Sequence, residues 1–541
     1  MYSFIPSWYA GPGDWHTNIA PWYQPTQSYE FDDTVNQIRM FRNAGEDTEL
    51  LCLAWSPNLR QFLHRQSLYP IPYWSAFDEL QNVRIRKPAV FSYLELSWPE
   101  DVEWVYLPSR LMAYRSAFGK TACADFASAR YKYACVELTE NGTLCWVEYY
   151  ENGLPEKRDI YDDRGFCSAS LFFQNGEEER QEFYDPEGRL RFTEDRRTGA
   201  VCISEEARGD FEKESYPSAK ELIREKLAFY FRQHREREAV VIAANRQHDG
   251  MILQTLREVP GQRIVLSFFE NRFDLQDEKA LQEDTEDACL IVTDTEHTAR
   301  LIEDAGVTGK NICDISPFDT RLSLGKSQRI RELKVFMPLD GLEGVLLEKA
   351  LVQVFSYMQK NQDVVLLAGT KKDTQHEQLA LKEKLEEVLA GMEERGLVVS
   401  VPWEQEEEAE EQENTAKKTA RIAVTPYHSE NDMIRILYDT RLILDVRDQP
   451  DLYLQIAGIS AGIPQVNYRY TRYVKHRKDG YIIQNINYIT GALEYYLDGL
   501  SGWNEALVYC VQEISRYTGG TLVEQWKQMI GEKNGPKPGT A

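Results

Sequence analysis

The stretch Leu442–Tyr468, which reads LILDVRDQPDLYLQIAGISAGIPQVNY, decides the fold. It begins with an apolar run that ends in Asp445-Val446-Arg447, and after a polar loop it continues with apolar residues at helical spacing over Leu452–Ile459. The turn Ala461-Gly462-Ile463-Pro464 follows, in which glycine suits a left-handed helix end and proline prevents the helix from continuing. A second β-type run closes the stretch, so we predict a βαβ unit of a parallel sheet.

The same alternation on both sides of this stretch predicts two α/β domains. Near the N-terminus, Asp32-Asp33 can cap a helix over Thr34–Asn43. Apolar runs predict strands at Tyr2–Pro6, Glu49–Ala54, Glu238–Asn245, Arg263–Phe269, Ala288–Asp294, Lys334–Met337, Asp363–Ala368, Leu397–Val401, Ala420–Thr425, Leu442–Val446, Gln465–Tyr468 and Gly480–Ile483. Further helices are expected at Asn58–Gln66, Trp74–Leu80, Ser218–Gln233, Met251–Leu256, Glu296–Glu303, Tyr488–Leu497, Trp503–Tyr517 and Leu522–Ile530.

Evenly spaced glycines set the middle of the chain apart. They fall in turns, several of the Asn-Gly type, at Gly142, Gly153, Gly165, Gly176, Gly188 and Gly199. The runs between them alternate apolar and polar residues, as in Tyr131–Leu138 (YKYACVEL), which is the pattern of antiparallel strands joined by tight turns. For residues 130–204 we predict an antiparallel meander of about seven strands.

Composition excludes several classes of function. The net charge of −25 over 541 residues argues against DNA or RNA as a ligand, because phosphate backbones need basic surfaces. The 9 cysteines lack paired or zinc-type spacing, which indicates free thiols in a reducing compartment, and the 8 histidines show no metal-binding spacing. We expect no secretory signal, because the N-terminus lacks a basic region and is interrupted by Pro6, and no apolar run is long enough to span a membrane. A cytoplasmic protein without cofactor or metal is the expectation.

Two charge runs and the C-terminus are read as surface features. The acidic run Glu404–Glu413 predicts a disordered loop, with a docking site as the alternative. The basic run Arg469–Lys478 (RYTRYVKHRK) predicts a solvated surface element, with contact to a membrane or another anion as the alternative. Glu532–Ala541 should form a loose tail.

The turn Ala461–Pro464 and its flanking elements resemble the signature of retaining GT-B glycosyltransferases. In that family two glutamates, the second just before the turn, hold the sugar nucleotide; registering on the turn places Gln449 and Ala457 at their positions. The family also neutralises the diphosphate with an arginine at the end of the first strand of the second domain and a lysine shortly after it. Registered on Leu339 and Gly344, those positions are Pro338 and Glu343.

The mismatch at these four positions predicts that the chain transfers no sugar. A glutamate in place of the lysine turns an attraction to the leaving group into a repulsion. At about 4 Å and an effective dielectric constant near 20, each pair of unit charges is worth roughly 4 kcal/mol, so the reversal amounts to several kcal/mol. Electrostatic stabilisation is usually the main source of rate in such chemistry. We therefore predict a degenerate, glycosyltransferase-like pseudoenzyme.

The resemblance implies a GT-B-like α/β fold, with two facing Rossmann-type domains and an antiparallel β-meander domain inserted in the first. We place the first domain at residues 1–107 and 206–325, the inserted sheet at 108–205 and the second domain at 326–515. Residues 516–541 are expected to form a closing helix that returns to the first domain, followed by the tail.

Five residues are candidates for contact with a sugar in the predicted interdomain cleft. The aromatic residues Trp8, Tyr9 and Trp15 could stack on a pyranose ring, or they could be packing residues at the domain interface. His428 follows a predicted strand, where it could touch a ligand or cap the next helix. Arg447 ends the strand that begins at Leu442.

Four short runs resemble the first accessory Sec-system protein family, a component of the export pathway for serine-rich repeat adhesins in Gram-positive bacteria. These runs are Phe4–Tyr9, Glu30–Val35, Leu59–Arg65 and Tyr73–Asp78, and the likeness extends over essentially the whole chain. The resemblance implies a GT-B-like protein without transferase activity in a complex with the second and third accessory Sec proteins. It further implies engagement of the glycosylated adhesin, the accessory SecA motor and the phospholipid surface at the inner face of the cell membrane.

Three hypotheses about function follow. In the first, a non-catalytic subunit assists delivery of the glycosylated adhesin to the translocase and binds its N-acetylglucosamine-type glycans. In the second, the chain is an active retaining glycosyltransferase that modifies the adhesin with other residues, such as Asp445, Arg447 or His428. In the third, it is a scaffold that binds no glycan.

Overall fold

A computed structural model describes residues 1–9, 15–18, 30–85, 87–107, 110–116, 130–139, 141–259, 261–307, 309–325, 327–372, 374–392, 396–403 and 420–531. The acidic run Glu404–Glu413 and the tail Glu532–Ala541 lie outside these residues. The chain forms two compact units. The first contains residues 1–29, 46–291 and 305–310, and the second contains residues 30–45, 292–304 and 311–541.

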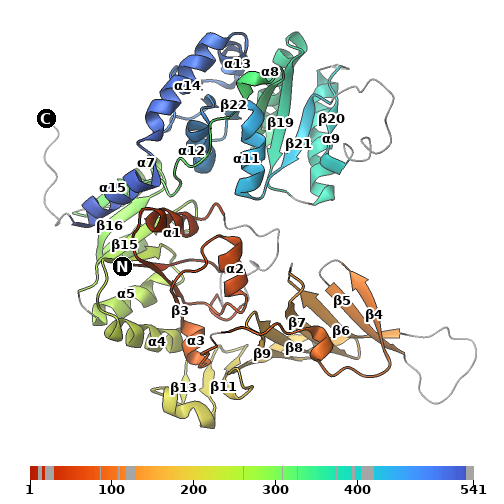
Figure 1. Ribbon diagram of the computed structural model, residues 1–541, viewed down its shortest axis with the longest axis vertical. Coiled ribbons are helices and arrows are strands. Elements are labelled where there is room, and N and C mark those ends of the chain that lie inside the picture. Colours follow the sequence, from red (N-terminus) through yellow and green to blue (C-terminus); the bar gives the residue numbers. More distant parts are fainter. Residues whose placement is uncertain are drawn as a thin grey trace, which may run out of the picture. The chain divides into compact units, whose positions relative to one another are not determined.

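The first unit contains a parallel Rossmann-type sheet (Figure 1). Its strand order is β16-β15-β14-β1-β2-β3. The central strands are buried along their whole length, which is why their sequences are nearly continuous apolar runs. The strands are β1 (Tyr2–Ile5), β2 (Thr48–Cys52), β3 (Tyr73–Ser75), β14 (Ala239–Ala243), β15 (Ile264–Phe268) and β16 (Ala288–Thr293). The helices are α2 (Leu59–Arg65), α3 (Ala76–Leu80), α4 (Ala219–Gln233), α5 (Asp249–Glu258) and α6 (Glu278–Thr285).

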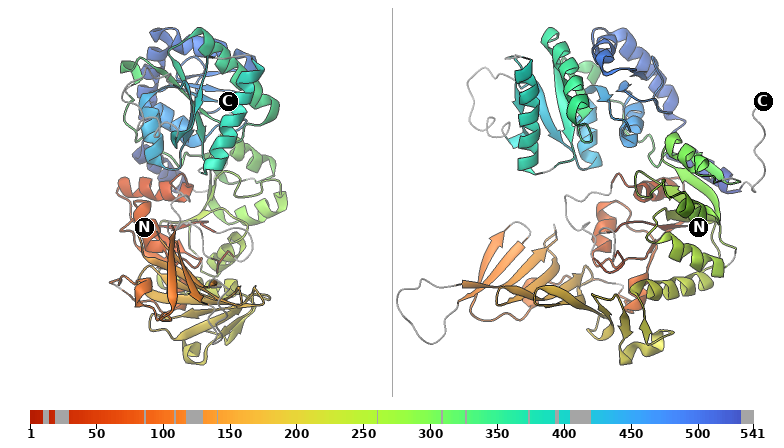
Figure 2. Two further views of the ribbon diagram at one scale, coloured as in Figure 1. Left: turned by 90° about the vertical axis from the view of Figure 1, so that its right-hand side faces the viewer. Right: turned by 180° about the vertical axis from the view of Figure 1, so that it is seen from behind.

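An antiparallel sheet of ten strands is inserted between α3 and α4 of this unit (Figure 2). Seven of its strands lie within the predicted range, and β4, β5 and β13 extend the sheet beyond it. The glycines that mark the turns, Gly142 to Gly199, all have positive φ angles, as tight hairpin turns require. The strands are β4 (Val102–Leu107), β5 (Arg110–Ser116), β6 (Arg130–Leu138), β7 (Leu144–Glu151), β8 (Leu154–Asp162), β9 (Phe166–Gln174), β10 (Glu177–Tyr184), β11 (Leu190–Asp195), β12 (Val201–Ile203) and β13 (Ser215–Tyr216).

The second unit contains another parallel sheet, in the order β20-β21-β19-β18-β22-β23-β24 (Figure 1). Its strands are β18 (Leu333–Pro338), β19 (Val364–Thr370), β20 (Val399–Ser400), β21 (Ile422–Pro426), β22 (Thr440–Asp445), β23 (Gln465–Asn467) and β24 (Gly480–Ile482), and β17 (Asn311–Asp314) also belongs to this unit. The helices are α1 (Asp33–Asn43), α7 (Glu296–Asp304), α8 (Gly344–Lys360), α9 (Gln375–Gly391), α11 (Glu430–Asp439), α12 (Leu452–Ala461), α13 (Ile489–Leu497), α14 (Leu500–Ile514) and α15 (Gly519–Gly531).

The βαβ unit predicted from Leu442–Tyr468 is confirmed as β22, α12 and β23. Asp451 caps α12 by accepting a hydrogen bond from the backbone N–H of Leu454 at 3.1 Å. Gly462 ends the helix with φ +72°, and a Cβ atom there would lie 2.4 Å from the side chain of Leu507. Glycine is therefore required at this turn for both its conformation and its size.

The structure differs from the sequence-based expectation around Trp74. A helix was expected over Trp74–Leu80, but Trp74 lies in β3 and pairs with Leu51 of β2, and α3 begins only at Ala76. Parallel pairing with β2 overrides the local helical pattern there. At the C-terminus, α15 packs against α1, with the rings of Phe41 and Trp526 5.5 Å apart. The fold class of two parallel Rossmann-type sheets and an inserted meander is confirmed, and the predicted domain boundaries stay predictions.

Candidate functional site

Charged side chains gather at the carboxyl ends of the strands in the second unit, where parallel α/β sheets commonly bind ligands. Asp445 ends β22 and accepts hydrogen bonds from Arg447 Nε at 2.8 Å and from Arg447 Nη2 at 2.6 Å. It also accepts the backbone N–H of Asp451 at 2.8 Å. The carboxylate of Asp451 lies 3.9 Å from Arg447 Nη2, so two aspartates share one guanidinium group.

Two neighbouring strands add charge to this group. Lys371 follows β19, and its Nζ atom lies 3.8 Å from the carboxylate of Asp451. Asp340 follows β18 and accepts hydrogen bonds from the backbone N–H of Lys371 at 2.5 Å and from the Thr370 hydroxyl at 2.8 Å. We call Asp340, Lys371, Asp445, Arg447 and Asp451 the strand-end cluster. It contains three acidic and two basic side chains.

Arg447, the more buried cation of the strand-end cluster, is neutralised within the protein. Burial by itself lowers the pKa of Arg447, but hydrogen bonds and charge from Asp445, and then the charge of Asp451, outweigh burial and raise it above its ordinary value. Tyr427 is buried beside the cluster, and burial and then the charge of Asp451 raise the pKa of its hydroxyl. A diphosphate group would meet a surplus of negative charge here.

The four positions matched to the glycosyltransferase signature lie around the same strand ends. Pro338 is buried at the end of β18, and Glu343 is exposed at the start of α8 without a side-chain capping hydrogen bond. Gln449 is exposed in the loop between β22 and α12, whereas Ala457 is buried within α12. None of the four side chains carries a positive charge, and only Glu343 carries a negative one.

His428 lies after β21 and is partly exposed. The expectation that it caps the next helix is wrong, because Ser429 is the N-cap of α11 and forms a capping box with Asp432. His428 contributes only its backbone N–H, which donates to Asp432 Oδ2 at 3.1 Å. Within the described part of the chain its imidazole ring has no hydrogen-bond partner, so the ring could contact a ligand at this edge.

The segment before α1 packs against these strand ends, which sequence reasoning missed. The rings of Phe31 and Tyr453 lie 4.7 Å apart, and Lys371 Nζ lies 5.7 Å from the Phe31 ring. Beside them, Glu430 lies 3.6 Å from Arg39 and 3.8 Å from Arg321. No local pattern reveals these contacts, because they join residues that are far apart in the sequence.

The three other candidate residues, Trp8, Tyr9 and Trp15, lie in the first unit, in the segment that follows β1. Trp8 is 2% exposed and packs against Phe62 with ring centroids 4.7 Å apart. Trp15 is 3% exposed and lies 4.3 Å from Tyr9, whose hydroxyl hydrogen-bonds His248 Nδ1. We call Trp8, Tyr9, Trp15 and His248 the aromatic cluster. Its burial favours packing over sugar stacking, which is the other alternative that the sequence left open.

Among the described residues, no group of three or more His, Cys, Asp or Glu side chains is arranged to hold a metal ion. A search of the same residues finds no helix long and apolar enough to cross a membrane. The two clusters therefore define the chemistry available at the strand ends: ion pairs and hydrogen bonds in one, aromatic packing in the other.

Comparison with known proteins identifies the family. A family model described as accessory Sec system protein 1, the first of the accessory secretory proteins, matches residues 1–533. The chain belongs to this accessory Sec system protein family. The family member from Streptococcus gordonii is 33% identical over 98% of this chain and 99% of its own length. The member from Staphylococcus aureus is 30% identical over 99% of both chains.

Solved structures agree with this assignment. A chain from the structure of accessory secretory proteins 1, 2 and 3 of Streptococcus pneumoniae matches with a TM-score of 0.79 and 30% identity, over 98% of this chain and 99% of that chain. The Glycosylation Associate Protein complex of Streptococcus agalactiae contains a chain that matches with a TM-score of 0.78 and 32% identity, over 97% and 99% of the two chains. Both matching chains come from structures that contain more than one protein.

More distant neighbours share the fold only. The pneumococcal O-GlcNAc transferase GtfA, solved with UDP and GlcNAc, matches with a TM-score of 0.65 and 11% identity over 98% of both chains. TarM matches with a TM-score of 0.64 and 11% identity, over 98% of this chain and 99% of that chain. The accessory Sec family member described here therefore has a GT-B-like fold.

Proposed function

We propose that this chain is a non-catalytic, glycosyltransferase-like subunit of the accessory Sec export complex. It assembles with the second and third accessory secretory proteins and assists delivery of the glycosylated serine-rich repeat adhesin to the translocase. It works with the accessory SecA motor at the inner face of the cell membrane, and it binds N-acetylglucosamine-type glycans of the adhesin. The relatives solved as multi-protein complexes support the assembly part of this proposal.

The strand-end cluster is the observation that supports a non-catalytic role. A retaining enzyme needs cations that are free to meet a diphosphate, but Arg447 is bound by Asp445, and Lys371 Nζ lies 3.8 Å from the carboxylate of Asp451. Each unit pair of like charges at about 4 Å opposes binding by roughly 4 kcal/mol at an effective dielectric constant near 20. Glu343 adds a further negative charge at the start of α8.

A turnover assay on the purified chain tests this part. UDP-N-acetylglucosamine is incubated with the chain and with bare adhesin repeats, and free UDP and modified peptide are measured. We expect neither product above a no-protein control, with an active glycosyltransferase run in parallel as the positive control. Sustained turnover that Asp445→Asn abolishes would establish the alternative, an active glycosyltransferase that uses other residues.

Glycan binding separates the leading proposal from a scaffold without sugar affinity. His428 and Gln449 are accessible and positioned after strand ends of the same sheet, so they can hydrogen-bond sugar hydroxyl groups. We expect calorimetry to show binding to glycosylated repeats and none to bare repeats, and His428→Ala with Gln449→Ala to weaken binding at least fivefold. His297→Ala, which removes an exposed histidine on α7, is the matched control. Equal binding of bare and glycosylated repeats would favour the scaffold.

A further inference from the structure

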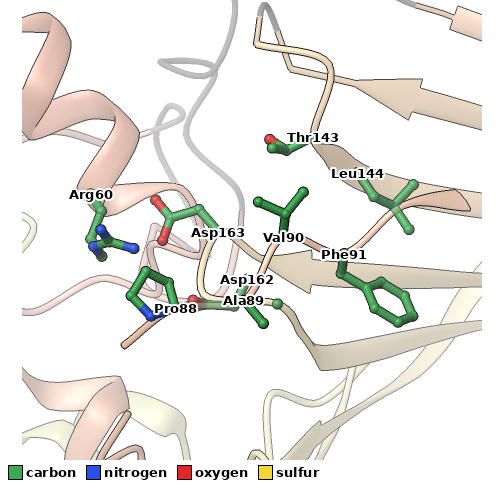
Figure 3. A pocket seen from close by; sticks show the side chains of 10 residues that line it. Arg60, Pro88, Ala89, Val90, Phe91, Thr143, Leu144, Asp162 and Asp163 are labelled. Carbon is green, nitrogen blue, oxygen red and sulfur yellow. The ribbon is translucent and has the colours of Figure 1, made fainter. Parts of the chain in front are cut away.

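A small cavity lies within the first unit, where the inserted sheet joins α2. Its volume is about 170 Å³, and Figure 3 shows the side chains that line it. Typical small-molecule sites enclose about 300–1,000 Å³, so this cavity suits one side chain better than a nucleotide or an oligosaccharide. Arg60 comes from α2, Val90 from the connecting segment before β4, and Thr143 and Asp163 from turns of the inserted sheet.

The walls of the cavity are held in place by main-chain contacts. The backbone N–H of Ala89 donates to the carbonyl of Arg164 at 3.1 Å, which fixes the connecting segment to the turn between β8 and β9. Gly165 in that turn has φ +92°, and a Cβ atom there would lie 2.4 Å from the carbonyl oxygen of Ala89. Asp163 binds α2 on the other side, because its carboxylate accepts the backbone N–H of Gln61 at 2.9 Å. The cavity is therefore preformed.

One cation in this cavity is left without a close partner. Among the described residues, no carboxylate forms an ion pair with the guanidinium group of Arg60, although its charge acts on Asp163 in the wall of the same cavity. Figure 3 shows the carboxyl group of Asp163 between Arg60 and Val90. The other charges at the site are already satisfied: Arg164 forms ion pairs with Asp162 at 2.6 Å and with Asp78 at 2.8 Å. A bound group must therefore complement Arg60.

The rim of the cavity is apolar and exposed. Val90 is 79% exposed at the opening, beside the exposed Pro88 and Ala89 of the same segment. An isolated small acid would leave these side chains in water, whereas a polypeptide that crosses the rim would cover them.

We propose that this cavity binds the carboxylate of an acidic side chain from a partner polypeptide, with Arg60 as the charge-pairing residue and Val90 as the apolar rim contact. Guanidinium groups bind carboxylates through two parallel hydrogen bonds, which gives both strength and orientation. This site lies in the first unit and is independent of the strand-end cluster. Its failure would leave the proposed function untouched.

Binding at this site should depend on pH through Asp163. The groups that face Asp163 are Asp162 and Arg164 from its own turn, Arg60 from α2 and Tyr73 from β3. Burial, and then the charge of Asp162, raise the pKa of Asp163 to about 7. Below pH 7 Asp163 is protonated and no longer offsets the positive charge of Arg60. Its carboxyl group can then also donate a hydrogen bond to the ligand. Above pH 7 the ionised Asp163 competes for Arg60, so affinity should fall by up to about tenfold per pH unit.

Saturation-transfer NMR on the full chain tests the proposal with two matched probes, N-acetyl-glutamate methylamide and N-acetyl-glutamine methylamide. We expect the glutamate probe to bind at pH 6, with up to about tenfold lower affinity at pH 8, and the glutamine probe to give no signal at either pH. Arg60→Gln should abolish the glutamate signal, and Arg60→Lys should retain part of it. Asp163→Asn should remove the pH dependence while binding persists.

Arg65→Gln, which removes a charge from the same helix, is the control and should bind like the wild type. Melting temperatures of all variants confirm that they are folded. The proposal is overturned if the two probes bind equally at pH 6, or if a folded Arg60→Gln variant binds the glutamate probe like the wild type. A signal that Arg65→Gln reduces as much as Arg60→Gln does would assign the binding to the general charge of α2 and would also overturn it.

Discussion

The two parallel sheets carry different contacts at the carboxyl ends of their strands. In the first unit this edge holds the aromatic cluster, in which buried rings pack on one another and His248 bonds Tyr9. In the second unit it holds the strand-end cluster, in which Asp445 and Asp451 pair with Arg447 and Lys371 lies beside Asp451. Both edges are lined by contacts within the protein, one by packing and the other by ion pairing. The same fold thus presents two physically different surfaces at the carboxyl ends of its strands.

The largest loss of stability is expected when a buried ring is removed from the aromatic cluster. Trp8→Ala leaves a cavity against Phe62, and large-to-small changes of this kind cost about 3–5 kcal/mol. We expect that loss in the free energy of unfolding of the first unit, measured by hydrogen exchange in peptides from β1 and β14. The control, Leu94→Ala, removes an exposed side chain and should change stability by less than about 0.5 kcal/mol. A loss below 1 kcal/mol for Trp8→Ala would show that the aromatic cluster is not a packing unit.

Breaking the central ion pair should cost slightly less. Asp445→Asn removes the charge that binds Arg447 and leaves Asp451, at 3.9 Å, as the remaining carboxylate beside it. Uncompensated buried charge costs about 3 kcal/mol or more. Hydrogen exchange in β22 and α12 should report this loss. Asp448→Asn, at an exposed position in the same loop, is the matched control, and an equal loss in both variants would refute the special role of Asp445.

A buried carboxyl group in the first unit, that of Asp163, should make stability depend on pH. The pKa of Asp163 is raised to about 7 by burial and by Asp162, whereas an aspartate in the unfolded chain titrates near pH 4. The folded state therefore binds more protons between about pH 4 and pH 7, so stability falls as pH rises through that window and is constant above it. The full shift corresponds to roughly 4 kcal/mol, which partial solvent access reduces to about 2 kcal/mol.

Asp163→Asn should accordingly be more stable than the wild type by about 2 kcal/mol at pH 8 and equally stable near pH 4. Melting temperatures of the two proteins across this range measure the difference. A difference that does not change with pH would contradict the expectation and would assign the effect to packing.

The smallest effect is expected for an exposed ion pair. Arg300 and Glu296 face each other on one side of α7, with 64% and 44% of their side chains exposed. Such pairs contribute about 0.3–0.5 kcal/mol, and salt screens them. Arg300→Gln should thus change the melting temperature of the second unit only slightly, and 1 M sodium chloride should abolish the difference. A loss comparable to that of Asp445→Asn would show that exposure does not separate the two kinds of ion pair.

Much of the fold could be predicted from local sequence patterns. The turn at Gly462, the capped helix after Asp32 and the glycine-marked hairpins each depend on neighbouring residues, and the structure confirms all three. Trp74 was assigned wrongly because its place in β3 depends on pairing with Leu51, which a helical pattern cannot reveal. The site was less predictable. Arg447 was recognised as a candidate, but its neutralisation by Asp445 and Asp451 was not.

The sequence by itself determined the element types and the order of the two α/β regions, and it supplied the prediction that the charged glycosyltransferase signature is missing at Pro338, Glu343, Gln449 and Ala457. These features are local, because a strand, a turn or a missing charge depends on residues that are close together in the sequence. Only the tertiary structure decided which charges meet. Asp340, Lys371 and Asp445 follow three different strands, and the interaction of a charge depends on distances that folding sets.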